Sequence, residues 1–75
     1  MATTQRSLSE VRPLAQSALS DSAIFDLRDL VVEQGDDALV LRGSVSSFYH
    51  KQVAQEVVRA VAGREVDVVN AIAVR

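Results

Sequence analysis

The 75-residue sequence predicts a single α+β domain with the order α-β-β-α-β, in which two helices pack on one face of a three-stranded mixed sheet. Apolar residues alternate with other residues from Leu30 to Val45 and again from Val68 to Val74, the period of half-buried strands. Between these stretches, valines and alanines recur at the three- and four-residue spacing of a helix. The change of period from about 2 to about 3.6 and back indicates a strand–strand–helix–strand unit.

The first helix has two conflicting start signals. Ser7 and Glu10 have the spacing of a capping box, which would start the helix near Leu8. Pro13 would then lie in the helix interior, at a cost of about 3 kcal/mol. A proline suits the first position of a helix, so we expect the helix at about Arg12 to Ser20. Its apolar side consists of Val11, Leu14, Ala15, Ala18 and Leu19.

Three strands are expected, separated by recognisable turn residues. Asp21 and Ser22 end the first helix, after which Ile24, Phe25 and Leu27 are expected to fill the core between helix and sheet. Gly35 lies in a short connection that suits a hairpin. The expected strands cover Arg28–Glu33, Ala38–Val45 and Val66–Val74.

The second helix is expected between Ser46 or Ser47, either of which suits an N-cap, and Ala62. Its valines are poor helix formers, but their spacing favours a helix that is stabilised by packing. Gly63 suits the C-terminal end, and the third strand should follow by a right-handed crossover. The expected buried stripe is Val53, Ala54, Val57, Val58 and Val61.

The size of the chain limits its stability. Residues 1–9 are polar and small and are expected to form a flexible N-terminal arm, which leaves residues 10–75 for the domain. The chain contains no cysteine, so neither a disulfide nor a zinc cluster can supplement a small core. We therefore expect such a chain to gain stability by associating with itself.

Composition excludes several classes of function. A net charge of −2 and a pI near 5.1 make nucleic acid an unlikely partner, because phosphate binders carry a basic surface. No apolar run approaches the roughly 20 residues of a membrane-spanning helix, and the start has no apolar signal region. The expected location is the cytoplasm, or the periplasm or a membrane surface if the native chain is longer.

Four sequence elements stand at a spacing that is specific in combination: Leu39-x-Leu41-x-Gly43-x-Val45-x-Ser47, Lys51-x-x-Ala54, Gly63 and Val68-x-Asn70-x-Ile72-x-Val74. Together they resemble the BON domain, a family named for a bacterial osmotically induced periplasmic protein and for nodulation proteins. The resemblance covers most of the chain, from the first helix to the last residue. It implies the fold described above and a role in attachment, to phospholipid membranes or to other proteins, without catalysis.

The sheet face opposite the helices is the first candidate site. If the alternating apolar residues face the helices, their neighbours point outward. Such a face would normally be mostly polar, whereas this one would carry small apolar residues with a charged rim, a pattern typical of a contact surface. A plain preference of valine and alanine for strands would explain the same residues. The candidate interface consists of Val31, Val40, Arg42, Val69, Ala71 and Ala73.

The start of the second helix is the second candidate site. Phe48 and Tyr49 precede Lys51 at a helix N-terminus, where free N–H groups and the helix dipole favour an anion such as a lipid phosphate. The alternative is structural: one ring in the core and the other along the surface. This structural alternative is the one that the sequence favours.

The remaining polar residues have structural interpretations. His50 has neither a cysteine nor a second histidine to complete a metal site, so it is expected to be a solvated helix residue. Asn70 should be partly buried and tie the last strand to a neighbouring loop. Gly43 should mark a bulge or a close approach of a helix. No pattern of catalytic residues can be placed, so no cofactor, metal or enzyme activity is expected.

The sequence therefore favours a small non-catalytic binding module that associates with itself through the exposed sheet face or an edge strand. Its expected partner is a second copy, forming a homodimer, or another protein. The alternative is a module that binds anionic phospholipid at a membrane surface.

Overall fold

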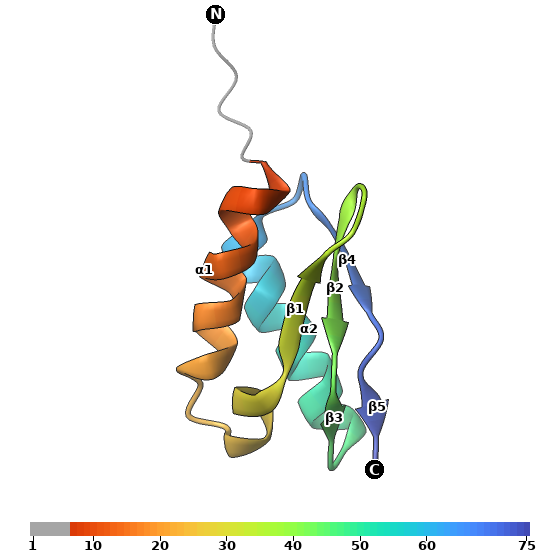
Figure 1. Cartoon of the computed structure of the whole chain (residues 1–75). Coiled ribbons are helices and arrows are strands. Elements are labelled where there is room, and N and C mark those ends of the chain that lie inside the picture. Colours follow the sequence, from red (N-terminus) through yellow and green to blue (C-terminus); the bar gives the residue numbers. More distant parts are fainter. Residues whose placement is uncertain (1–6) are drawn as a thin grey trace, which may run out of the picture.

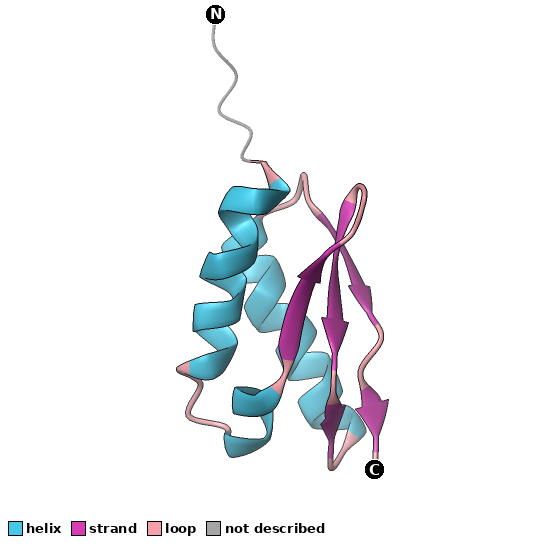
Figure 2. Ribbon diagram, in the orientation of Figure 1, coloured by secondary structure: helices cyan, strands magenta, loops and turns pink. Residues whose placement is uncertain are grey.

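The structure is a computed structural model that describes Ser7 to Arg75, and it has two layers, helices on one side and strands on the other (Figure 1). The two α-helices cover one face of the strands, and the opposite face carries none of the described helices (Figure 2). The predicted α+β fold with a mixed sheet is confirmed. In chain order the elements are α1 (Leu8–Ser20), the 3₁₀ helix η1 (Phe25–Asp29), β1 (Val31–Gln34), β2 (Ala38–Arg42), β3 (Ser44–Val45), α2 (Phe48–Ala62), β4 (Asp67–Asn70) and β5 (Ala73–Val74).

The sheet has the order β1-β2-β4, with β1 antiparallel and β4 parallel to the central strand β2. Beyond it, β3 and β5 pair in parallel and continue the same register, since Leu41 pairs with Asn70 and Ser44 with Ala73. The strands predicted over 38–45 and 66–74 are therefore each interrupted once.

Gly43 causes the interruption between β2 and β3. Its φ of +127° is open to glycine, and a Cβ atom there would lie 2.8 Å from the Cδ2 of Leu30. The backbone turns out of the strand conformation at this point to bring Leu30 close. Neither predicted role is found: the register with the last strands is the same on both sides of Gly43, so no residue is bulged out, and the close neighbour is Leu30 and not a helix.

The core lies between the helices and the inner face of the sheet, as the alternation predicted. The strand residues expected to face the helices are buried, except that Val68 and Val74 are half-buried. Ala54 and Val58 of the predicted stripe of α2 are fully buried, and the rest of the stripe is half-buried. The buried residues are Val11, Ala15, Leu19, Leu27, Leu30, Val32, Leu39, Leu41, Val45, Ala54, Val58, Val66 and Ile72.

The predicted start of the first helix is wrong. Helix α1 begins at Leu8 with a complete capping box between Ser7 and Glu10, and Pro13 lies inside it. The carbonyl that Pro13 leaves without an N–H partner belongs to Ser9, which is exposed, so water can bind it and reduce the cost. Residues 7–9 thus belong to the helix and its cap. The rest of the predicted arm, residues 1–6, lies outside the described residues.

The segment before β1 also differs from the prediction. Residues Phe25–Asp29 form a 3₁₀ helix, and the strand begins at Val31 instead of Arg28. With three residues per turn, Ile24 and Leu27 share one side, and the Leu27 N–H donates to the Ile24 carbonyl. Leu27 is buried and Ile24 half-buried, whereas Phe25 points away and is 75% exposed. The expectation that Phe25 fills the core is therefore wrong.

The predicted second helix is confirmed at both ends. The Ser47 hydroxyl accepts a hydrogen bond from the His50 N–H at the start of α2. At the other end Gly63 has a φ of +84°, and its N–H donates to the Arg59 carbonyl. Neither helix between Ser7 and Arg75 has the length and apolar character needed to cross a membrane.

Candidate interaction surfaces

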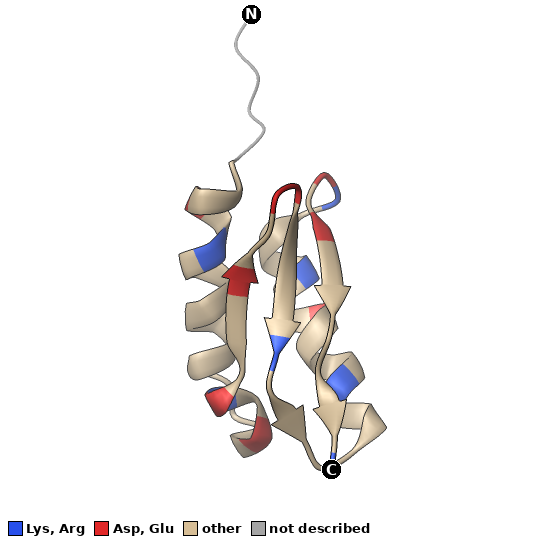
Figure 3. Cartoon of the chain, turned by 45° about the vertical axis from the view of Figure 1, so that its right-hand side comes forward, with Lys and Arg blue, Asp and Glu red and all other residues tan. Residues whose placement is uncertain are grey.

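The outer face of the sheet carries every residue predicted for it. Val31 and Val69 are 47% and 50% exposed, Val40 is half-buried, and the remaining three are exposed. Figure 3 shows this face turned forward, with the helices behind the strands. The predicted set therefore does form one surface, although its role as an interface remains a prediction.

Charged and apolar side chains are interleaved on the β1–β2 half of this face. Val31 lies opposite Arg42, and Glu33 lies opposite Val40. The Arg42 Nε donates to the Glu33 Oε1 at 2.6 Å, so an exposed ion pair runs diagonally from β1 to β2. Exposed pairs of this kind contribute little stability, about 0–1 kcal/mol.

An apolar strip remains on the other half of the face. Val40 pairs directly with Val69, and the strip continues along the last strands through Ala71 and Ala73. We call Val40, Val69, Ala71 and Ala73 the apolar strip. It borders the free edge of β4 and β5 and ends near two charged residues, Asp67 and Arg75.

The edge formed by β1 is closed by α1. The Gln16 Nε2 donates to the Leu30 carbonyl at 2.8 Å, and the Gln16 Oε1 accepts from the Val32 N–H at 2.9 Å. Arg12 adds a longer bond, 3.4 Å, to the Val32 carbonyl. One side-chain amide thus occupies a donor and an acceptor at the start of this edge, whereas no described side chain bonds the outward groups of Gln34 at its end. No local pattern in the sequence marks Gln16 as the residue that binds this edge.

The edge formed by β4 and β5 is largely free. The N–H groups of Ala71, Ala73 and Arg75 donate inward, to the carbonyls of Leu41, Gly43 and Val45. Because strand groups alternate, the N–H and C=O groups of the even-numbered residues point away from the sheet. These residues are Val68, Asn70, Ile72 and Val74. Within Ser7–Arg75, the side-chain hydrogen bond on this edge is the one from the Ile72 N–H to the Asn70 Oδ1.

Asn70 connects this edge to α2. Its Nδ2 donates to the Lys51 carbonyl at 3.0 Å and to the Gln55 Oε1 at 3.1 Å. The predicted partial burial is confirmed, but the partner is a helix and not a loop. The amide therefore points inward and leaves most of the edge uncovered.

A polar cluster around Asp26 joins three distant segments. The Asp26 Oδ2 accepts from the Ser46 N–H at 2.7 Å, from the Ser46 hydroxyl at 2.6 Å, and bonds the His50 Nδ1 at 2.9 Å. The Arg75 Nη2 donates to the other carboxylate oxygen at 3.1 Å. The Ser46 hydroxyl, and after it His50, the Ser46 N–H and the Arg75 charge, hold the pKa of Asp26 well below its usual range.

The position of His50 corrects the sequence prediction. Its side chain is 28% exposed and is held by Asp26, so it is not a freely solvated helix residue. Asp26 was not identified from the sequence, because its partners are 20, 24 and 49 residues away along the chain. Periodicity describes neighbours within one element and carries no information about such distances.

The same cluster differs from a nucleophile–base–acid chain. In such a chain the histidine lies between the hydroxyl and the carboxylate. Here Ser46 and His50 both bond the Oδ2 of Asp26, and the Ser46 hydroxyl donates its hydrogen bond to the carboxylate and not to the histidine. This arrangement joins η1, the start of α2 and the end of β5.

A pocket of about 360 Å³ lies beside the cluster. It contains both signs of charge, two carboxylates and one guanidinium, so it favours neither an anion nor a cation. Its lining residues are Phe25, Asp26, Asp29, Gly43, Ser44 and Arg75.

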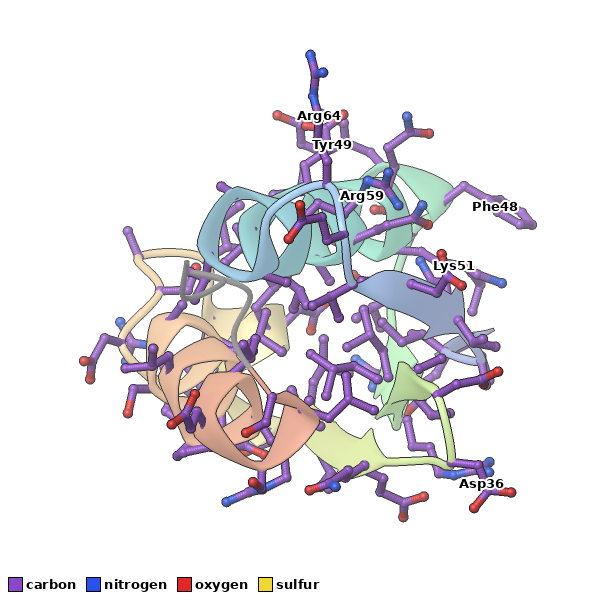
Figure 4. The ribbon with its side chains drawn as sticks, turned by 90° about the horizontal axis from the view of Figure 1, so that it is seen from above. Asp36, Phe48, Tyr49, Lys51, Arg59 and Arg64 are labelled. Atoms are coloured by element: carbon purple, nitrogen blue, oxygen red, sulfur yellow. The ribbon has the colours of Figure 1, made fainter. Side chains whose placement is uncertain are left out.

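The aromatic residues at the start of α2 are both exposed, Phe48 by 75% and Tyr49 by 70%. The expectation that one ring enters the core is wrong. Counting back three and four residues from the buried Ala54 leads to Lys51 and His50, so these two, not the rings, share its side of the helix. Figure 4 shows Phe48 pointing away from the body of the molecule on the side of Lys51, while Tyr49 projects from a different side.

A third exposed ring lies at the same end of the molecule. Phe25 is 75% exposed, and the Arg28 guanidinium lies over its ring, 5.3 Å from the centroid. Figure 1 places η1 and the start of α2 at this end, where the bonds from Ser46 to Asp26 link them. We call Phe25, Phe48 and Tyr49 the aromatic end.

Comparisons with known proteins add no family to these observations. No model of a known protein family matches the chain, and a comparison with curated proteins finds no match. In the part of the chain from Ser7 to Arg75, no group of three acidic, histidine or cysteine side chains could hold a metal ion.

Proposed function

We propose that this protein is a small non-catalytic binding module that associates with a second copy of itself through the exposed face or an edge of its sheet. One observation carries the proposal: Val31 and Val69 are about half exposed on a sheet face that no described helix covers. A solvated face of a sheet is normally polar, and exposed apolar residues on it are typical of a contact surface. The resemblance to the BON domain, whose suggested role is attachment, points in the same direction.

The size of the molecule limits how such a contact can be made. A stable interface buries roughly 800 Å² on each partner. The whole chain exposes 4797 Å², so such an interface would take about a sixth of its surface. The apolar strip is narrow and consists of two valines and two alanines, so the contact must also use groups beside the strip.

Sedimentation at several protein concentrations tests the proposal. We expect the apparent mass to rise with concentration, and Val69→Asp to weaken association, because the new charge would lie in a face contact or directly beside an edge contact. Leu14→Asp is the matched control, since Leu14 is similarly exposed, 46%, but lies on α1. A wild-type chain that stays monomeric at high concentration, or equal behaviour of both variants, contradicts the proposal.

The aromatic end supports a second candidate function, attachment to an anionic phospholipid surface. Three exposed rings at one end, with Arg28 and Lys51 nearby in sequence, suit a membrane interface, where rings enter the headgroup region and cations bind phosphate. The sequence predicts Phe48, Tyr49 and Lys51 for this role, and the exposure of the Phe48 and Tyr49 rings favours it.

Flotation with vesicles that contain phosphatidylserine tests lipid attachment. We expect the wild-type chain to float at low salt and Phe48→Ser to float less, because a ring is lost from the contact. Val69→Asp should float like the wild type, since Val69 lies on the sheet. Absence of flotation at low salt contradicts this second candidate and leaves self-association unaffected.

A further inference from the structure

We infer that two copies associate edge to edge, with β4 and β5 of one copy pairing antiparallel with the same strands of the other about a two-fold axis at Ala71. The inference rests on the proposed function and specifies which part of the sheet makes the contact. It would join the two three-stranded sheets into one continuous sheet.

The two edges of the sheet differ in what they can bind. On β1, Gln16 already occupies the Leu30 carbonyl and the Val32 N–H. On the β4–β5 edge, the outward N–H and C=O groups of Val68 and Val74 take no side-chain hydrogen bond from any residue between Ser7 and Arg75. Unpaired strand groups of this kind bind another strand readily, so the free edge is the one available for pairing.

Symmetry and alternation restrict the register. Two copies of one edge that are related by a two-fold axis pair antiparallel. The outward-pointing residues are even-numbered, so even residues must face even residues in the hydrogen-bonded pairs. With the axis at Ala71, Asn70 faces Ile72 of the second copy and Val68 faces Val74. The Ile72 N–H then exchanges its bond to the Asn70 Oδ1 for a bond to the Asn70 carbonyl of the second copy. Ala71 then faces Ala71 of the second copy in a pair without hydrogen bonds.

Charge selects this register among its neighbours. It places Asp67 directly opposite Arg75 of the second copy, on the outer face, twice by symmetry. A shift of two residues in one direction puts Arg75 opposite Val69. The same shift in the other direction puts Asp67 opposite Ala73 and Arg75 opposite Glu65, which lies in the turn before β4 and not on the strand edge. Opposite charges facing each other across a strand pair are favourable by about 0.2–1 kcal/mol.

Both charged residues are accessible for this contact. Asp67 is exposed and has no ion pair with any residue from Ser7 onward. The Arg75 side chain is 55% exposed, and its contacts to Ser44 and Asp26 use Nη1 and Nη2 and leave the Nε–H group free within the described residues.

The apolar strip also fits the register. Val69 would face Ala73 of the second copy, and the two Ala71 side chains would meet at the axis. The strips of the two copies would then form one apolar band in the middle of the joined sheet. Small side chains at the axis let the two edges approach without a clash.

Introduced cysteines test the geometry, because the chain contains none of its own. Residues facing each other without hydrogen bonds have Cα atoms about 4.5 Å apart, within the range of a disulfide. We expect Ala71→Cys to form a disulfide-linked dimer under mild oxidation, measured as the dimer fraction on a non-reducing gel. Val31→Cys is the control on the closed edge and should form at least tenfold less dimer.

A charge reversal tests the register. Asp67→Lys would place two cations opposite each other, so we expect self-association to weaken several-fold, with the loss reduced at high salt. Asp37→Lys makes the same change of charge in the hairpin turn and should leave association unchanged. Equal effects of the two variants overturn the register.

The outcomes separate this inference from the proposed function. If the wild-type chain dimerises but Ala71→Cys forms no more dimer than Val31→Cys, edge pairing is wrong and the proposed self-association stands. Efficient crosslinking through Val40→Cys, in the middle of the outer face, together with none through Ala71→Cys, would instead show face-to-face packing. A wild-type chain that stays monomeric overturns both.

Discussion

The two edges of the sheet carry the same backbone groups, and each is connected to a helix by one side-chain amide. At β1 the amide belongs to Gln16 of α1 and points at the strand, where it takes up an edge carbonyl and an edge N–H. At β4 the amide belongs to Asn70 of the strand and points at α2, where it binds the Lys51 carbonyl and the Gln55 side chain. The difference teaches that the direction of the amide, and not its presence, decides whether an edge is closed.

The largest effect on stability is expected at Gly43, which lies between β2 and β3, away from both edges of the sheet. Gly43→Val places a branched side chain at a φ of +127° and its Cβ 2.8 Å from the Cδ2 of Leu30. Backbone strain of this kind costs about 1–3 kcal/mol, and overpacking costs a similar amount. We therefore expect the free energy of unfolding to fall by at least about 3 kcal/mol. Urea denaturation measures it. Gly35→Val, at a site with ordinary φ, should cost less; an equal cost would contradict the role of Gly43.

The next largest effect is expected at Gln16, whose side chain closes the β1 edge. Gln16→Leu leaves the Leu30 carbonyl and the Val32 N–H without their partner, which costs about 1–3 kcal/mol where such groups are buried. The same change frees β1, so we also expect larger aggregates in sedimentation, because each copy then has two free edges. Gln52→Leu, at an exposed position of α2, is the control. A variant that stays as stable and as soluble as the wild type would show that α1 does not close this edge.

A smaller effect is expected at the amide of the open edge. Asn70→Ala removes the bonds to Lys51 and Gln55 and the acceptor of the Ile72 N–H, and we expect a loss of about 1 kcal/mol, since these groups are half-buried. Because the variant also frees the Ile72 N–H, self-association should not weaken in proportion to stability. Denaturation and sedimentation of the same samples separate the two effects. A complete loss of self-association would mean that Asn70 itself belongs to the contact.

The smallest effect is expected in the pH dependence of stability. It comes from Asp26, which binds Arg75 at the end of the open edge. The pKa of Asp26 is lower in the folded state than in the unfolded chain. Its stabilising contribution is therefore fully present above the unfolded pKa, about 4, and is lost as pH falls toward the folded pKa. We expect the difference in denaturation midpoint between the wild type and Asp26→Asn to be constant near pH 7 and to shrink below about pH 4. Asp21→Asn, at an exposed position, should show no such trend; a difference that grows on acidification would contradict the assignment.

The elements with a strong period were predictable, because one buried face repeats along them. Residues 48–62 were assigned to a helix despite their valines, since the spacing of Ala54 and Val58 outweighs local propensity. The alternation along the strands likewise predicted which residues point outward, including Val31 and Val69. Irregular segments were harder to predict. The 3₁₀ helix at Phe25–Asp29 has three residues per turn, which matches neither the period of an α-helix nor that of a strand. The start of α1 depended on whether the capping box outweighed Pro13.

By itself, the sequence determined the order of the two α-helices and the three strands of the main sheet, the inner and outer faces of that sheet, and the C-terminal cap at Gly63, while it left the N-cap of α2 open between Ser46 and Ser47. These are consequences of short-range sterics and of burying one side of each element. Only the tertiary structure decided that Gln16 closes one edge, that Asn70 leaves the other largely free, and that Asp26 collects donors from three segments. Each of these contacts joins residues 14 or more positions apart, and a hydrogen bond over such a distance depends on where the folded elements come to lie.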